Sequence, residues 1–90
     1  MLEKTIESAV CLYARSEGWL VYKFVSPSNR GVPDRILIRN GVVFFIEFKA
    51  TGKKMTKLQA HIKVKLNKEG LMVFTVDDID QGKGIIDGMG

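Results

Sequence analysis

Two apolar runs joined by Asn40 and Gly41 constrain this chain more than any other feature of its 90 residues. The first run covers residues 35–39 and the second covers residues 42–48. Asparagine followed by glycine is the strongest short-range signal for a β-hairpin, because both residues tolerate the positive φ angles of a tight type I′ turn. The pattern therefore predicts two antiparallel strands joined by a two-residue turn.

A two-residue turn also fixes which residues face each other across the hairpin. Arg39 then faces Val42, and following the ladder to its open end brings Asp34 opposite Glu47. Opposed residues on one face of a sheet have Cβ atoms ~5 Å apart. Because side chains alternate along a strand, Lys49 projects on the same face as Glu47. We therefore expect two carboxylates and an ammonium group at the open end, although a bulge or a longer turn would shift this pairing.

This grouping suits a metal-assisted hydrolysis of phosphodiesters. Two carboxylates this close repel each other unless a cation lies between them or one takes a proton. Mg²⁺ is usually held by one or two carboxylates together with substrate phosphate and water, and there it activates water for attack. Lys49 would orient that water or stabilise charge on the phosphate. The alternative is that Glu47 and Lys49 are plain edge charges and that Asp34 caps a loop.

The first third of the chain predicts one helix, one strand and a loop. Apolar residues recur at helical spacing from Leu2 onward, and Gly18 ends the pattern. Residues 19–25 are rich in β-branched and aromatic side chains, which predicts a strand. Residues 26–33 are rich in turn formers and predict a loop that leads into the hairpin.

The last third predicts a helix, a strand and a short final helix. Thr56 followed by Gln59 matches a capping box, so a helix should begin there and run to about Glu69. Residues 71–76 read as a strand, and the glycine-rich tail after residue 77 as a short, weakly specified helix. The order of helix, three strands, helix and strand predicts an α/β sandwich around a mixed sheet.

Length and composition narrow the class of protein. Ninety residues suffice for one compact domain, so we expect a single domain over residues 1–90. No stretch approaches the ~18 consecutive apolar residues of a membrane span. The single cysteine, Cys11, excludes an internal disulfide and fits a reduced cytoplasmic setting. The net charge of +4 favours polyanionic partners, but many mildly basic proteins bind no nucleic acid.

Several of these residues occur together in a known family. Gly31, Val32, Pro33 and Asp34 precede the hairpin, Glu47, Phe48 and Lys49 end it, and Gln59 follows at a helix start. With Glu7 in the first helix and residues 50–54 after the lysine, residues 3–76 resemble the virus-type replication-repair nuclease (VRR-NUC) domain. That family belongs to the PD-(D/E)xK nuclease superfamily, so the resemblance implies a restriction-endonuclease-like core.

The resemblance also implies roles for individual residues. Three groups would bind the metal: Asp34, Glu47 and the backbone carbonyl of Phe48. Glu7 would complete the site directly or through water, although such a helix-edge glutamate is usually solvated and Glu3 is a rival. Lys49 would assist the nucleophilic water. Gln59 would help order the site, although its capping box explains it without catalysis.

Two loops beside the expected site offer candidate contacts to DNA. Lys53 and Lys54 lie next to a flexible glycine and suit phosphate contacts that position DNA without reading its bases. Ser28, Asn29 and Arg30 lie in the loop leading into Asp34 and are candidates by proximity alone. Solvated loops are the alternative in both places.

We therefore expect a Mg²⁺-dependent DNA endonuclease in which Mn²⁺ can substitute. Standalone members of the family resemble homodimeric Holliday junction resolvases, which implies a homodimer, a four-way junction substrate and a phage or bacterial source. The alternatives are a nuclease acting on flaps, nicks or plain duplex, a catalytically inactive DNA-binding module, and a protein-interaction domain with incidental charge.

Overall fold

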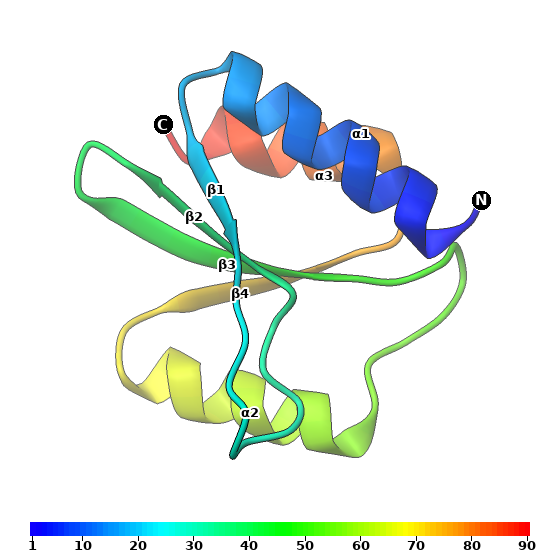
Figure 1. Ribbon diagram of the computed structural model, residues 1–90, viewed down its shortest axis with the longest axis vertical. Helices are drawn as coiled ribbons and strands as arrows, with labels where there is room; N and C mark the ends of the chain where they lie inside the picture. Colours follow the sequence, from blue (N-terminus) through cyan, green and yellow to red (C-terminus); the bar gives the residue numbers. More distant parts are fainter.

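The computed structural model describes residues 1–90 as a three-layered α/β sandwich (Figure 1). A four-stranded sheet forms the middle layer, with α1 and α3 side by side on one face and α2 on the other. The element bounds are α1 Glu3–Ser16, β1 Leu20–Lys23, β2 Arg35–Arg39, β3 Val42–Phe48, α2 Lys57–Lys68, β4 Met72–Val76 and α3 Ile79–Gly88. The β3–β4 pair is parallel and the other pairs are antiparallel, so the mixed sheet is confirmed.

The hairpin turn and its register agree with the sequence prediction. Asn40 and Gly41 both have positive φ, at 50° and 78°. The β2–β3 ladder begins with Arg39 opposite Val42 and continues without a bulge through the remaining residues of β2. The open end of the hairpin is therefore where the sequence predicted it.

The first strand is shorter than predicted, and the predicted tail helix is well formed. The first strand ends at Lys23 rather than near residue 25, because the chain turns away from the sheet and only the N–H of Phe24 still bonds across, to the carbonyl of Asp34 (2.9 Å). The tail forms a helix of ten residues capped by Asp78. Its Gly82 allows close packing on α1, because a Cβ there would lie 2.6 Å from a methyl group of Val10.

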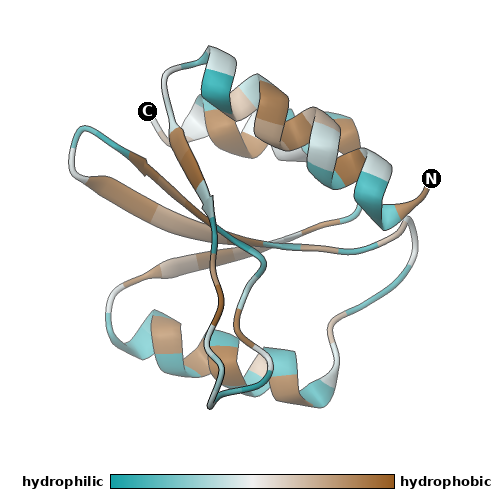
Figure 2. Ribbon diagram, viewed as in Figure 1, coloured by the Kyte–Doolittle hydropathy of each residue, from teal (hydrophilic) through white to brown (hydrophobic).

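The hydrophobic core lies between the sheet and the α1/α3 layer. Buried residues of that core include Ile6, Val10, Phe44, Ile46 and Ile86. In contrast, α2 buries none of its residues, and Figure 2 shows teal bands alternating with brown along it. The sheet face beneath α2 still buries Phe45, Val73 and the charged Glu47. No helix of the structure has the length and apolarity needed to cross a membrane.

Candidate active site

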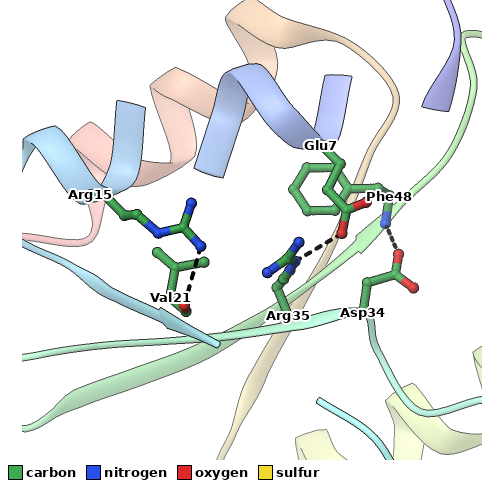
Figure 3. A network of polar contacts seen from close by, with 6 residues as sticks. All are labelled: Glu7, Arg15, Val21, Asp34, Arg35 and Phe48. Carbon is green, nitrogen blue, oxygen red and sulfur yellow. Dashed lines mark hydrogen bonds and ion pairs between the residues drawn. The ribbon is translucent and has the colours of Figure 1, made fainter. Parts of the chain in front are cut away.

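Asp34 and Glu47 lie together at the open end of the hairpin. Glu47 is the only charged residue in the buried set, with 2% of its surface exposed. The N–H of Asp34 donates to the carbonyl of Ile46 (3.1 Å), which keeps the chain paired one residue beyond β2. The Asp34 Oδ2 atom in turn accepts a 2.7 Å hydrogen bond from the N–H of Phe48, as Figure 3 shows. The backbone at the end of β3 therefore fixes the Asp34 carboxylate.

Gln59 reaches the same site from the first turn of α2. Its side-chain amide donates to Glu47 Oε2 (2.8 Å). Its amide oxygen accepts from the N–H of Thr56, and the Thr56 hydroxyl accepts from the Gln59 N–H, so the predicted capping box is present. One glutamine thus forms the cap and contacts Glu47, because the cap uses its oxygen and leaves its nitrogen for Glu47. Its role in ordering a nuclease site stays a prediction.

Burial and repulsion control the charge of this carboxyl pair. The pKa of Glu47 is raised from 4.5 to about 8, first by burial and then by the negative charge of Asp34, while the ammonium of Lys49 lowers it. Each carboxylate has one oxygen held by a donor and one left for a cation or a shared proton. The pair is therefore strained electrostatically until a positive charge joins it.

The donor set fits a small hard cation. Carboxylate oxygens are the ligands that Mg²⁺ prefers, and one or two of them usually suffice when phosphate and water complete the shell. No cluster of three or more acidic, histidine or cysteine side chains that could hold a metal ion occurs in the structure. A cation here would accordingly depend on Asp34, Glu47 and non-side-chain ligands, and the predicted role of the Phe48 carbonyl is consistent with that need.

Glu7 is not hydrogen-bonded to the carboxyl pair. Its Oε2 atom forms an ion pair with the guanidinium of Arg35 (2.8 Å) on the sheet face that α1 covers. Glu7 and Asp34 do line a common cavity of about 260 Å³, together with Lys23 and Phe24. A ligand role for Glu7 thus stays a prediction. The sequence missed its partner Arg35, because nothing local links a helix residue to a strand 28 positions later.

The loop of residues 26–33, which precedes Asp34, packs closely against α2. Gly31 has a φ of +85°, and a Cβ at this position would lie only 2.8 Å from the Leu58 side chain. A side chain at position 31 would clash with Leu58, which explains the glycine in the motif. Leu58 directly precedes Gln59, so the close approach of the loop also fixes the start of α2 next to the site. The predicted contacts Ser28 and Arg30 are exposed in this loop, so they are accessible to a ligand.

We use the name basic loop for residues 50–55, which carry Lys53 and Lys54. Both lysines are exposed. Asp77 fixes the loop, since its carboxylate accepts from the N–H of Gly52 (3.0 Å) and its carbonyl accepts from the hydroxyl of Thr51 (3.0 Å). These contacts of Asp77 could not be predicted from the sequence, because the two segments approach only through the crossover of α2 and β4.

Comparisons with known proteins bear on the family and the fold, although no family model matches the chain. A protein named "Putative nuclease p44" from Acyrthosiphon pisum secondary endosymbiont phage 1 is 40% identical over 79 residues, which cover 87% of this chain and 85% of that protein. A solved structure described as "VRR_NUC domain" is similar with a TM-score of 0.87 and 25% identity, covering 94% of each chain. Another, "VRR_NUC domain protein", has a TM-score of 0.82 and 19% identity, covers 99% of this chain and 88% of its own, and supports the fold alone.

Proposed function

The chain belongs to the VRR-NUC family of nucleases, and from that premise we propose that it is a metal-dependent DNA endonuclease that cuts branched DNA. One observation carries the proposal. The buried Glu47 and the anchored Asp34 form a carboxyl pair beside Lys49. A buried pair of like charges is costly unless a cation or a proton neutralises it, so the arrangement suits a metal site better than a structural one.

The proposed cofactor is Mg²⁺, with Mn²⁺ able to substitute. Asp34 and Glu47 would hold it, with the Phe48 carbonyl and, directly or through water, Glu7 as further ligands. When bound, such a cation supplies Lewis acidity that polarises the phosphodiester and favours ionisation of the attacking water. Two carboxylates, each with one oxygen free of a donor, occupy only part of the coordination shell and leave positions for phosphate and water.

The chain's own residues would orient the two carboxylates and balance the charge of the site. The N–H of Phe48 and the amide of Gln59 hold one oxygen of each carboxylate, so neither side chain needs to reorganise on binding substrate. The ammonium of Lys49 favours the ionised form of Glu47. In the reaction Lys49 would orient the attacking water or stabilise the charge that grows on the phosphate.

DNA would approach over the exposed loops beside the site. Lys53 and Lys54 of the basic loop, with Ser28 and Arg30 on the other loop, would contact backbone phosphates, which position a duplex without reading its sequence. Such contacts would make DNA binding weaker as the salt concentration rises.

The proposed setting of the protein is the cytoplasm, and the buried free thiol of Cys11 fits this proposal.

We further propose that the protein works as a homodimer. The edge strand β1 exposes more than half of Leu20 and Tyr22, and the adjacent Val25 is 72% exposed. An edge strand with apolar side chains is a site for pairing with another chain, and a second copy would cover it. Two sites related by a two-fold axis would suit paired cuts in a four-way junction. Light scattering after gel filtration tests the dimer, and Tyr22→Lys should shift it toward monomer.

The activity is tested with labelled four-way junction and matched linear duplex, each incubated in Mg²⁺ or in chelator. We expect junction cleavage in Mg²⁺ only, no cleavage by Asp34→Asn, and full cleavage by Asp80→Asn, a matched change at an exposed carboxylate on α3. Equal cutting of both DNAs would indicate a flap, nick or duplex nuclease instead. DNA retention in chelator without any cutting in Mg²⁺ or Mn²⁺ would indicate a binding module.

A further inference from the structure

Thr75 lies next to Glu47 in the sheet. The two residues are register partners in the parallel β3–β4 pair. Register partners on neighbouring strands point to the same face, so the Thr75 side chain flanks Glu47 from β4. Asp34 flanks Glu47 from the β2 side and Gln59 reaches it from α2. Thr75 therefore occupies the remaining side of the carboxyl group that carries the site.

The hydroxyl of Thr75 is buried and has no hydrogen-bond partner. Only one other side-chain polar atom in the structure shares that condition, the indole nitrogen of Trp19. Trp19 packs against Phe44 in the core beneath α1, on the opposite face of the sheet. A buried donor without an acceptor lowers stability, whereas valine has the same shape and no such group. The hydroxyl of Thr75 accordingly calls for an explanation beyond packing.

Burial limits what this hydroxyl can contact. Its oxygen is closed to solvent, so it cannot touch DNA directly. The backbone carbonyl of Thr75 already accepts from the side-chain amide of Gln81 (3.3 Å), which fixes the strand at this point. Among the polar groups identified around Thr75, the carboxyl of Glu47 is the acceptor on the same face and at the same register. Carboxylate oxygens accept more than one hydrogen bond each, so the bond from Gln59 leaves capacity for another.

We propose that Thr75 is a positioning residue of the nuclease site, whose hydroxyl donates to the Glu47 carboxylate when that carboxylate holds its cation. The inference rests on the proposed function. Gln59 and Thr75 then hold Glu47 from two elements, α2 and β4, and restrict the directions in which its free oxygen points. Partners that orient a metal ligand typically change metal affinity or activity ~10–100-fold when they are lost.

Thr75→Val tests the proposal, since it removes the hydroxyl and keeps the shape, with Thr75→Ser restoring the hydroxyl. Thr5→Val, an exposed position on α1, is the matched control. Three quantities are measured: Mn²⁺ affinity by titration calorimetry, thermal unfolding in chelator, and kcat and KM on four-way junction. For Thr75→Val we expect an equal or higher melting temperature, ~10-fold weaker Mn²⁺ binding, a lower kcat and an unchanged KM. Thr75→Ser and Thr5→Val should resemble the wild type.

The outcomes separate this inference from the proposed function. A wild type that binds no Mn²⁺ and cuts no DNA overturns the proposed function, and the role of Thr75 with it. A wild type that binds and cuts, together with an equally active Thr75→Val, overturns the role of Thr75 alone. A lower melting temperature of Thr75→Val in chelator overturns it too, because the hydroxyl would then already have a structural partner in the metal-free protein.

Discussion

Replacing Glu47 by glutamine should remove a pH-dependent loss of stability from the metal-free protein. The pKa of Glu47 is raised from 4.5 to about 8 by burial and by the charge of Asp34. Below pH 4.5 the group is protonated in both the folded and the unfolded chain. As pH rises toward 8 only the unfolded chain loses its proton, so the free energy of unfolding falls, and above pH 8 the full penalty is present. An amide at this position cannot ionise and keeps an oxygen for Gln59.

The size of the effect follows from the pKa. Each tenfold change in proton affinity is worth ~1.4 kcal/mol. The pKa shift of Glu47 therefore sets an upper limit of about 5 kcal/mol on the free energy of unfolding that is lost as pH rises. Water at the open end of the hairpin screens part of the repulsion, and we expect roughly 2 kcal/mol. For a domain of this size a difference of that order moves the melting temperature by about 10 °C.

The assay is urea unfolding of wild type and Glu47→Gln in chelator at pH 5 and pH 8. Between pH 5 and pH 8 the free energy of unfolding of the wild type should fall by about 2 kcal/mol more than that of the variant. Saturating Mg²⁺ should stabilise the wild type at pH 8 but not the variant, because ligands that bind only the folded state stabilise it. If both proteins respond to pH alike in chelator, neither burial nor the charge of Asp34 raises the pKa of Glu47, and the electrostatic case for the metal site fails.

Three further substitutions test how the site is supported. Gly31→Ala should destabilise the fold by about 1–3 kcal/mol in urea unfolding, because its Cβ would meet Leu58 at 2.8 Å with φ at +85°; unchanged stability would contradict the contact. Gly82→Ala should cost a similar ~1–3 kcal/mol, because its Cβ would lie 2.6 Å from Val10, and a wild-type melting curve would refute tight α1–α3 packing. Asp77→Ala should raise KM for DNA several-fold and leave kcat unchanged, since it frees the basic loop; an unaltered KM would exclude that loop from binding.

The hairpin could be predicted from sequence because its determinants are local. Asn40 and Gly41 set the turn, alternation set the faces, and the register then placed Asp34 and Glu47 together without any tertiary information. The capping box of Thr56 and Gln59 is local as well, and it fixed where α2 begins. These short-range signals sufficed to bring the candidate residues to one end of one hairpin.

The supporting contacts could not be predicted, because they depend on how distant segments cross. The parallel register that sets Thr75 beside Glu47 is decided by the length and path of α2, not by any local signal. The same holds for the hydrogen bonds of Asp77 to the basic loop and for the ion pair between Glu7 and Arg35. Sequence spacing identifies residues that can act together, and packing decides which neighbours orient them.

The two sides of the site differ in how firmly they are held. Asp34 is fixed by the backbone of β3, whose neighbours Ile46 and Phe48 are fully or almost fully buried in the core beneath α1 and α3. Gln59 instead belongs to α2, which buries no residue and depends on its capping box, its packing on β4 and the contact at Gly31. Elements with few buried contacts open most readily, so α2 is the part of the site expected to move. A substrate that neutralises Glu47 should therefore tighten α2 more than the sheet, which hydrogen exchange would register as added protection confined to α2.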